Sequence, residues 1–259
     1  MRLAWATDIH LNFVDEAGLD RFIDALRAEQ PDAAVITGDI GEANDWFTFV
    51  DLIEDRLGKP VWFVLGNHDF YRGSIKAARE KARGMRWLVA RSVIALNDRT
   101  GLVGHDGWGD ARLGNFRSSP VFLNDFLLIA ELVHPMNSVR VERLRQLGDE
   151  AAAHFRDVLP IALSRFDRVM VATHVPPFRG AAWHEGKSSD DDWLPYYSCQ
   201  AVGDALLEAA DANPLKQITV LCGHTHGGGY FQPRANLEVY TGPAEYGAPG
   251  VQRCFEFLP

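Results

Sequence analysis

Residues that could ligate metal ions recur at the ends of short apolar runs in this sequence. They are aspartate, histidine and asparagine side chains without a thiolate, a set that suits zinc, iron or manganese and argues against iron–sulfur chemistry. Residues two apart in an extended chain point to the same side, so the pairs Asp8/His10 and His224/His226 are each expected to face one site. The candidate ligands are Asp8, His10, Asp39, Asn67, His174, His224 and His226.

Seven candidate ligands are too many for one tetrahedral metal, but they suit two metals that share a carboxylate. Asp39 is the expected bridge, because it follows a middle strand and a carboxylate has two oxygens to offer. Two metals about 3.5–4 Å apart can bind a phosphate from both sides, activate a bridging water as the nucleophile, and stabilise the attacking and leaving oxygens. The chemistry indicated is the hydrolysis of a phosphate ester.

The elements that must position these residues alternate between strands and helices. Each group of candidate ligands follows an apolar run, and parallel α/β sheets collect ligands outside the carboxyl ends of their strands. The predicted strands cover residues 3–7, 33–37, 61–65, 87–96, 102–103, 168–173, 218–222, 238–241 and 254–257. The predicted helices cover residues 19–26, 46–57, 74–83 and 138–158, and one more helix begins after Ser198, its expected N-cap.

The composition is that of a soluble globular chain. The 259 residues include 26 Lys and Arg against 35 Asp and Glu, a net charge of −9. This balance disfavours binding to nucleic acid or an anionic membrane, which requires a positive surface. Without a repeat or a linker, one domain over residues 1–259 is predicted, with substrate-facing loops around 101–137 and 175–197.

The cysteines and the first residues predict a cytoplasmic location. Three widely spaced cysteines form neither a disulfide framework nor a thiolate metal site. The chain reaches Asp8 too early for the apolar stretch of a signal peptide. The apolar stretch at 121–133 is too short and too polar to span a bilayer.

Five motifs occur in a fixed order along most of the chain: D-x-H, G-D, G-N-H-D, a lone His and G-H-T-H, from Asp8 to His226. Together they resemble the calcineurin-like metallophosphoesterase family. The resemblance implies an α/β fold, a four-layer αββα sandwich with two mixed sheets between helices. It also implies one metal held by Asp8, His10, Asp39 and His226, and a second held by Asp39, Asn67, His174 and His224.

The resemblance assigns His68 a role other than metal binding. It implies that His68 points towards the leaving group as a general acid or phosphate donor, with Asp69 orienting its ring. Two departures concern the substrate. The phosphatases of this superfamily carry G-D-x-x-D-R-G, whose arginine clamps phosphate, whereas residues 38–44 read G-D-I-G-E-A-N. Asp69 replaces their glutamate, which again favours the phosphodiesterase-like branch.

Four further residues are candidates for contact with the substrate. Arg72 and Arg179 each lie a few residues beyond a ligand and could clamp a phosphate, although solvated surface arginine is the simpler interpretation of each. His105 lies in a glycine-rich stretch and is either a loop residue without a role or part of the rim of the site. Trp183 could stack on a base or sugar, although packing within a cap is the commoner role of such an aromatic residue.

The hypothesis that follows is a hydrolase of small soluble phosphate esters such as nucleotides, acting on either monoesters or diesters with two Mn, Fe or Zn ions. An alternative is a nuclease or a lipid-headgroup phosphoesterase; the net charge and the lack of a basic stripe or membrane anchor count against these. A third is a catalytically silent scaffold, which predicts a damaged ligand set. Every motif position is filled. The sequence does not give the oligomeric state.

Overall fold

The computed structural model describes residues 1–258, and its first sheet has the strand order β12-β1-β2-β3. Strands β1, β2 and β3 of this order run parallel because helices connect them, and β12 pairs antiparallel with β1. The strands are β1 (Arg2–Ala6), β2 (Ala33–Thr37), β3 (Val61–Val64) and β12 (Val251–Glu256). The helices beside them are α1 (Glu16–Ala28), α2 (Trp46–Leu57) and α3 (Ile75–Ala82).

The second sheet has six strands in the order β10-β11-β9-β6-β5-β4. Its central strands are parallel, and the outer pairs β10/β11 and β4/β5 are antiparallel. The strands are β4 (Ile94–Asn97), β5 (Thr100–His105), β6 (Arg168–Thr173), β9 (Gln217–Cys222), β10 (Gly229–Arg234) and β11 (Leu237–Thr241). Two long helices cover this sheet, α5 (Asn137–Arg165) and α7 (Gln200–Ala212).

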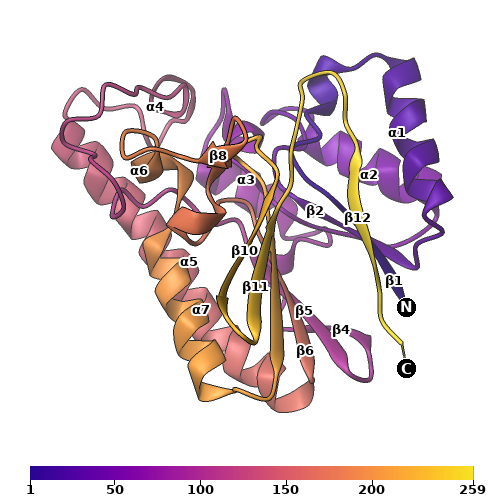
Figure 1. Cartoon of the computed structure of the whole chain (residues 1–259). Coiled ribbons are helices and arrows are strands. Elements are labelled where there is room, and N and C mark those ends of the chain that lie inside the picture. Colours follow the sequence, from indigo (N-terminus) through magenta and orange to yellow (C-terminus); the bar gives the residue numbers. More distant parts are fainter. Residues whose placement is uncertain (259) are drawn as a thin grey trace.

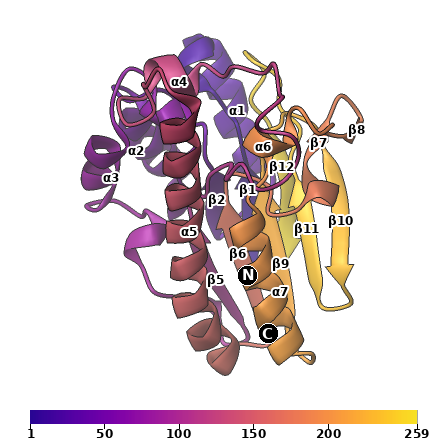
Figure 2. The same cartoon turned by 90° about the vertical axis from the view of Figure 1, so that its left-hand side faces the viewer.

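The two sheets pack face to face with helices on both outer surfaces, which confirms the four-layer αββα sandwich (Figure 1). Apolar side chains such as Trp5, Val35 and Met170 fill the space between the sheets. Phe22 and Phe63 belong to the core under α1, α2 and α3. The second helical layer is formed by α5 and α7, which lie side by side (Figure 2). Burial on both faces explains why the parallel strands are almost entirely apolar.

Most predicted elements agree with the structure, and the differences have physical causes. The stretch at 87–96 is a 3-10 turn (Leu88–Ala90) followed by β4, and β5 occupies the start of the expected 101–137 loop. Ser198 does not cap α7, because its hydroxyl donates to the Leu194 carbonyl and Cys199 is the N-cap. The strand β10 was not predicted, since it is a half-exposed edge strand that contains Pro233.

Two segments lie over the carboxyl end of the sheets, and we call residues 106–136 and 175–199 together the cap. They hydrogen-bond to each other: the Asn115 N–H donates to the Asp191 carbonyl at 2.7 Å, and the Ala111 N–H to the Pro195 carbonyl at 2.9 Å. The cap's short elements are α4 (Asp125–Leu128), β7 (Trp183–His184), β8 (Lys187–Ser188) and α6 (Leu194–Tyr197). In the described part of the chain, no helix has both the length and the apolar character needed to cross a membrane.

Candidate metal centre

The seven candidate ligands converge at one edge of the two sheets. They come from the loops after five strands, β1, β2 and β3 of the first sheet and β6 and β9 of the second. Asp8, His10, Asp39 and His174 are almost completely buried, while His224 and His226 are partly exposed. The sandwich therefore places ligands from both sheets around a common centre.

Four of these residues form a first cluster, Asp8, His10, Asp39 and His226, whose ligating atoms all lie within 4.8 Å of one another. Nε2 of His10 lies 3.1 Å from Nε2 of His226 and 3.8 Å from Oδ2 of Asp39. Nε2 of His226 lies 3.5 Å from Oδ1 of Asp8. Two imidazole and two carboxylate groups this close together match the ligand set of a first-row metal ion.

A second cluster lies on the other side of Asp39. Nε2 of His174 is 3.4 Å from Oδ1 of Asp39 and 3.1 Å from Oδ1 of Asn67. The same Asn67 oxygen is 2.9 Å from Nδ1 of His224. Asp39 thus turns Oδ2 towards the first cluster and Oδ1 towards the second, the arrangement that a bridging carboxylate requires.

The surroundings of two histidines fit ligation by the nitrogen that faces the second cluster. Nδ1 of His174 lies 2.8 Å from the Thr37 carbonyl, and Nε2 of His224 lies 3.1 Å from the Tyr196 carbonyl. A carbonyl only accepts, so each of these ring nitrogens carries the proton. The opposite nitrogen faces the cluster, where it can offer a lone pair to a cation, as is usual for metal-binding histidines.

The backbone of the ligand loops is not extended. The expectation that residues two apart face the same side had required an extended chain. Asp8, His10, Asp39, His224 and His226 all have positive φ, between 40° and 70°. Asp8 and His10 nevertheless face the same cluster, whereas His224 and His226 face different ones, so the expectation that alternate residues face one site together is correct for the first pair and wrong for the second. Non-glycine residues adopt this left-handed conformation rarely, and such strain is typical of functional sites.

Glycines beside the ligands provide the space that the centre needs. Gly38 has φ of 90°, and a Cβ there would lie 2.6 Å from Nδ1 of His174. A Cβ at Gly223 would lie 1.9 Å from Oδ2 of Asp8. In the actual backbone the His224 N–H approaches both oxygens of Asp8, at 3.0 and 3.1 Å. Any side chain at these two positions would displace a candidate ligand.

Burial and mutual interaction set the charge states of the ligands. Burial lowers the pKa of His10 and of His224 to about 3, so both rings are neutral and able to bind a cation. For His174 burial acts downwards, but the negative Asp39 outweighs it and raises the pKa to about 10. Burial also raises the pKa of Asp8. The buried carboxylates and the neutral rings of His10 and His224 form a receptor for positive charge, which fits metal ions, and a cation bound at the second cluster would replace the proton on Nε2 of His174.

His68 lies beside the first cluster rather than within it. Its ring centroid is 4.6 Å from that of His10, and its ring stacks on Tyr71 at 4.2 Å. The backbone N–H of His68 donates to Oδ1 of Asp39 at 2.8 Å. The His68 ring is partly exposed beside the centre, so it can reach a molecule bound there.

Asp69 does not orient the His68 ring, contrary to the expectation. Its Oδ1 accepts from the N–H groups of Ile40 and Gly41 at 2.9 and 3.0 Å, and its Oδ2 from that of Gly66 at 2.8 Å. A buried carboxylate satisfies nearby backbone donors first. Asp69 instead joins the loop after β3 to the loop that carries Asp39.

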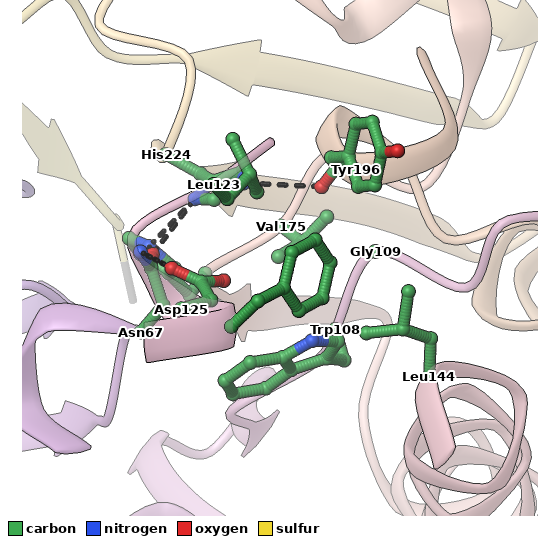
Figure 3. Close-up of a pocket in the computed structure, with 11 residues that line it drawn as sticks. Asn67, Trp108, Gly109, Leu123, Asp125, Leu144, Val175, Tyr196 and His224 are labelled. Atoms are coloured by element: carbon green, nitrogen blue, oxygen red, sulfur yellow. Dashed lines mark hydrogen bonds between the residues drawn. The ribbon is translucent and has the colours of Figure 1, made fainter. Parts of the chain in front are cut away.

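None of the four candidates for substrate contact lines the pocket beside the second cluster. Arg72 pairs with Glu42, and Arg179 with Asp191 at 2.6 Å, and both arginines are more than half exposed. Trp183 packs against the backbone of Gly229. His105 was expected in a loop, but it ends β5 and is 1% exposed. The pocket that these residues do not reach holds about 10 Å³, the space of one water molecule, and Leu123 and Phe126 of the cap are among the residues that line it. Figure 3 shows this pocket, with Leu123 labelled.

Sequence reasoning missed three residues near the centre. Tyr246 is half exposed, and its ring lies 4.6 Å from that of His10 and 5.0 Å from that of His226. Asp125 of α4 and Tyr71 hydrogen-bond around Asn67. Nothing in the local sequence marks Tyr246 or Asp125; the tyrosine in G-N-H-D-F-Y, three residues beyond His68, was the one available signal.

Comparison with known proteins agrees with this geometry. A family model described as calcineurin-like phosphoesterase matches residues 1–228. The UDP-2,3-diacylglucosamine hydrolase of Xanthomonas campestris pv. campestris (strain B100) is 30% identical over 199 residues, which cover 66% of this chain and 77% of that protein. The enzyme of the same name from Stenotrophomonas maltophilia (strain R551-3) is 29% identical over 198 residues, with the same coverage.

Solved structures share the fold at low sequence identity. The phosphopantetheinyl hydrolase of Mycobacterium tuberculosis superposes with a TM-score of 0.65 and 13% identity, covering 96% of this chain and 94% of that one. A dimetal phosphatase from Danio rerio has a TM-score of 0.55 and 16% identity, covering 94% and 87%. At sequence identities this low, the superpositions show that the fold is shared and show nothing about activity.

Proposed function

This chain belongs to the calcineurin-like phosphoesterase family and is therefore a metal-dependent phosphoester hydrolase, and from that premise we propose how its site works and what it hydrolyses. The seven converging residues would hold two divalent metal ions, one at each cluster, with Asp39 as the residue that the two clusters share. The observation that carries this proposal is that the two oxygens of Asp39 face different clusters. The two ions supply Lewis acidity and an activated water when bound.

The chain's own residues then have separate tasks around the phosphate. His68 donates a proton or hydrogen bond to the leaving oxygen, because it adjoins the first cluster without belonging to it. Tyr246, whose hydroxyl lies 3.5 Å from Nε2 of His68, contacts the substrate from the solvent side. Arg72 and Arg179 are engaged by Glu42 and Asp191 and do not clamp the phosphate, so its charge would be met by the cations that the two clusters would hold.

The proposed substrate is a small nucleotide-type phosphodiester or diphosphate. The absence of the arginine motif supports a diester over a monoester, and the net charge of −9 counts against a polynucleotide. The relatives named for UDP-2,3-diacylglucosamine also act on a nucleotide-linked compound. The metals are Mn, Fe or Zn, the ions that nitrogen and oxygen ligands of this kind suit.

A second candidate is a nucleotide-linked lipid, as in the name of those relatives. The cap favours it, because four large apolar side chains there are more than half exposed. They are Phe122, Leu127, Val133 and Met136. Exposed apolar residues gathered on one segment are typical of contact with an apolar ligand or partner. On this proposal the acyl chains lie along the cap while the diphosphate occupies the metal centre.

A substrate panel distinguishes the two candidates. The protein loaded with Mn²⁺ is assayed on an aryl phosphodiester, an aryl phosphomonoester, UDP-glucose and UDP-2,3-diacylglucosamine, with metal analysis of the same preparation. Comparable kcat/KM for both UDP compounds supports the small soluble substrate. A preference of about 100-fold or more for the acylated compound, lost in Leu127→Ser with the aryl diester rate unchanged, supports the lipid. Two bound ions without hydrolysis of any compound would refute the proposed function.

A further inference from the structure

A buried carboxylate from the cap reaches the second cluster without being one of its ligands. Asp125 is 3% exposed, and its Oδ1 accepts hydrogen bonds from Nδ2 of Asn67 at 3.0 Å and from the Tyr71 hydroxyl at 2.7 Å. Nδ2 of Asn67 also donates to the Tyr71 oxygen at 3.1 Å. Figure 3 shows Asp125 beside Asn67, at the end of the pocket that holds His224. The three side chains form a closed hydrogen-bonded triangle.

This triangle decides which atom of the Asn67 amide faces the cluster. An amide carries two donors on its nitrogen and acceptor lone pairs on its oxygen, and the two ends can exchange places by rotation. Asp125 and Tyr71 engage the nitrogen, so Oδ1 points to Nε2 of His174 and Nδ1 of His224. In the opposite orientation the oxygen would face the Asp125 carboxylate, and a nitrogen without a free lone pair would face the cluster.

The same triangle also supports the ring of His68. The Tyr71 ring stacks on the His68 ring with an interplanar angle of 29°. The Tyr71 hydroxyl is held by Asp125, so the position of this ring depends on the cap as well as on the loop after β3. Nδ1 of His68 is buried and has no hydrogen-bond partner among the described residues, so that ring is restrained by stacking on Tyr71 and by the contact of Nε2 with the Tyr246 hydroxyl at 3.5 Å.

We propose that Asp125 and Tyr71 are positioning residues that hold Asn67 in its ligating orientation, so that the cap sets the affinity of the second metal site. The inference rests on the proposed function only in taking that cluster as a metal site. Groups that orient a ligand typically change metal affinity by about 10- to 100-fold when they are removed. The first cluster contains neither Asn67 nor a hydrogen bond to Asp125, so we expect the loss of Asp125 to act chiefly on the second site.

The test is titration of the metal-free protein with Mn²⁺ alone, followed by calorimetry and by elemental analysis after dialysis. The variants are Asp125→Leu, which removes the acceptor, Asp125→Asn, which keeps an oxygen able to accept, and Tyr71→Phe, which keeps the stacking ring. Asp110→Asn is the matched control. Asp110 is a buried carboxylate of the cap that accepts from the Ala201 N–H at 2.9 Å and touches no candidate ligand.

We expect two Mn²⁺ sites in the wild type and in Asp110→Asn. Asp125→Leu should weaken one site by about 10- to 100-fold and leave the other unchanged. Asp125→Asn should recover part of the loss, and Tyr71→Phe should lose less than Asp125→Leu. The kcat of Asp125→Leu for an aryl phosphodiester should fall at limiting Mn²⁺ and recover when Mn²⁺ saturates.

Three results would overturn the proposal: two unchanged Mn²⁺ affinities in both Asp125→Leu and Tyr71→Phe, equal weakening of both sites, or an equal loss in Asp110→Asn. If Asp125→Leu does not fold, Tyr71→Phe is the deciding variant: two unchanged Mn²⁺ affinities in it would overturn the proposal. Because the readout is metal binding, it also holds for a protein that hydrolyses none of the panel compounds, so failure of the proposed function is seen separately.

Discussion

The hydroxyl of Tyr246 lies 3.5 Å from Nε2 of His68, and the ring of Tyr246 covers His10 from the solvent side. Burial raises the pKa of Tyr246 to about 12, so this hydroxyl keeps its proton and can donate a hydrogen bond to an anion. Tyr246 follows the residues matched by the family model, which end at 228. The residue is therefore a contribution of this chain's own C-terminal region to the site.

Replacement of Tyr246 by Phe removes one hydrogen-bond donor and keeps the ring. We expect kcat for an aryl phosphodiester to fall by about 3- to 10-fold, the equivalent of one hydrogen bond, with two Mn²⁺ still bound. Steady-state kinetics and metal analysis check this result. Tyr230→Phe, which alters a half-exposed tyrosine on β10, should behave as the wild type. Equal rates for the two variants would remove Tyr246 from the site.

Replacement of His68 by Ala should lower kcat much more than it changes metal content. A positioned general acid contributes about 10²- to 10⁴-fold, and the loss should shrink for a substrate whose leaving group needs no proton, such as a 4-nitrophenyl ester. The measurement compares leaving groups of different pKa at saturating Mn²⁺. A variant that no longer binds two ions would show that His68 is a ligand.

Replacement of Asp39 by Asn should reduce turnover to the uncatalysed background while the fold persists. The amide offers one ligating oxygen in place of two, so the clusters can no longer share this residue. Elemental analysis should find fewer than two ions per chain, and circular dichroism should match the wild type. Asp211→Asn, in a surface pair with Arg234, is the control. Full activity in Asp39→Asn would exclude the bridged centre.

Replacement of His105 by Gln should make stability less sensitive to acid. Burial, the Arg79 charge and His154 hold the pKa of His105 well below its usual value of 6.5. Below pH 6.5 the unfolded chain therefore binds a proton that the folded chain refuses, and stability is lost as the pH falls, by at most about 1.4 kcal/mol per pH unit.

The measurement for His105→Gln is urea unfolding from pH 8 to pH 5 at saturating Mn²⁺. As the pH falls, the free energy of unfolding of the wild type should decrease more than that of the variant. His134→Gln, on the surface of the cap, serves as the reference. Parallel curves for wild type and His105→Gln would show that this histidine titrates alike in the folded and unfolded chains.

The main strands and helices could be predicted from the hydrophobic periodicity of the sequence, because burial determines that periodicity. The boundaries of β2 and α2 match the predicted ranges, since strands buried on both faces are continuously apolar and helices with one buried face repeat every third or fourth residue. Edge strands lack that signal, and β10 was missed. Ser198 follows the usual sequence of an N-cap, yet the Leu194 carbonyl competes successfully for its hydroxyl.

The metal centre was accessible to sequence reasoning for a different reason. Parallel strands bring their carboxyl ends together, so residues as distant as Asp8 and His226 could be placed in one site. The orientation of single side chains could not be derived, because it depends on left-handed backbone at the ligands and on partners far away in the chain. Asp125 lies 58 positions from Asn67, and Asp69 satisfies backbone donors that no motif names.

Five of the seven candidate ligands have left-handed backbone, each at a cost of about 1 kcal/mol. The summed conformational cost is comparable with the net stability of a small domain, so the ligand loops should be strained without cations and stabilised when cations bind. The metal-free chain should release this strain by local opening, with amide hydrogens of the loops exchanging well before those of the strands beneath. We therefore expect the metal-free fold to open first at the ligand loops.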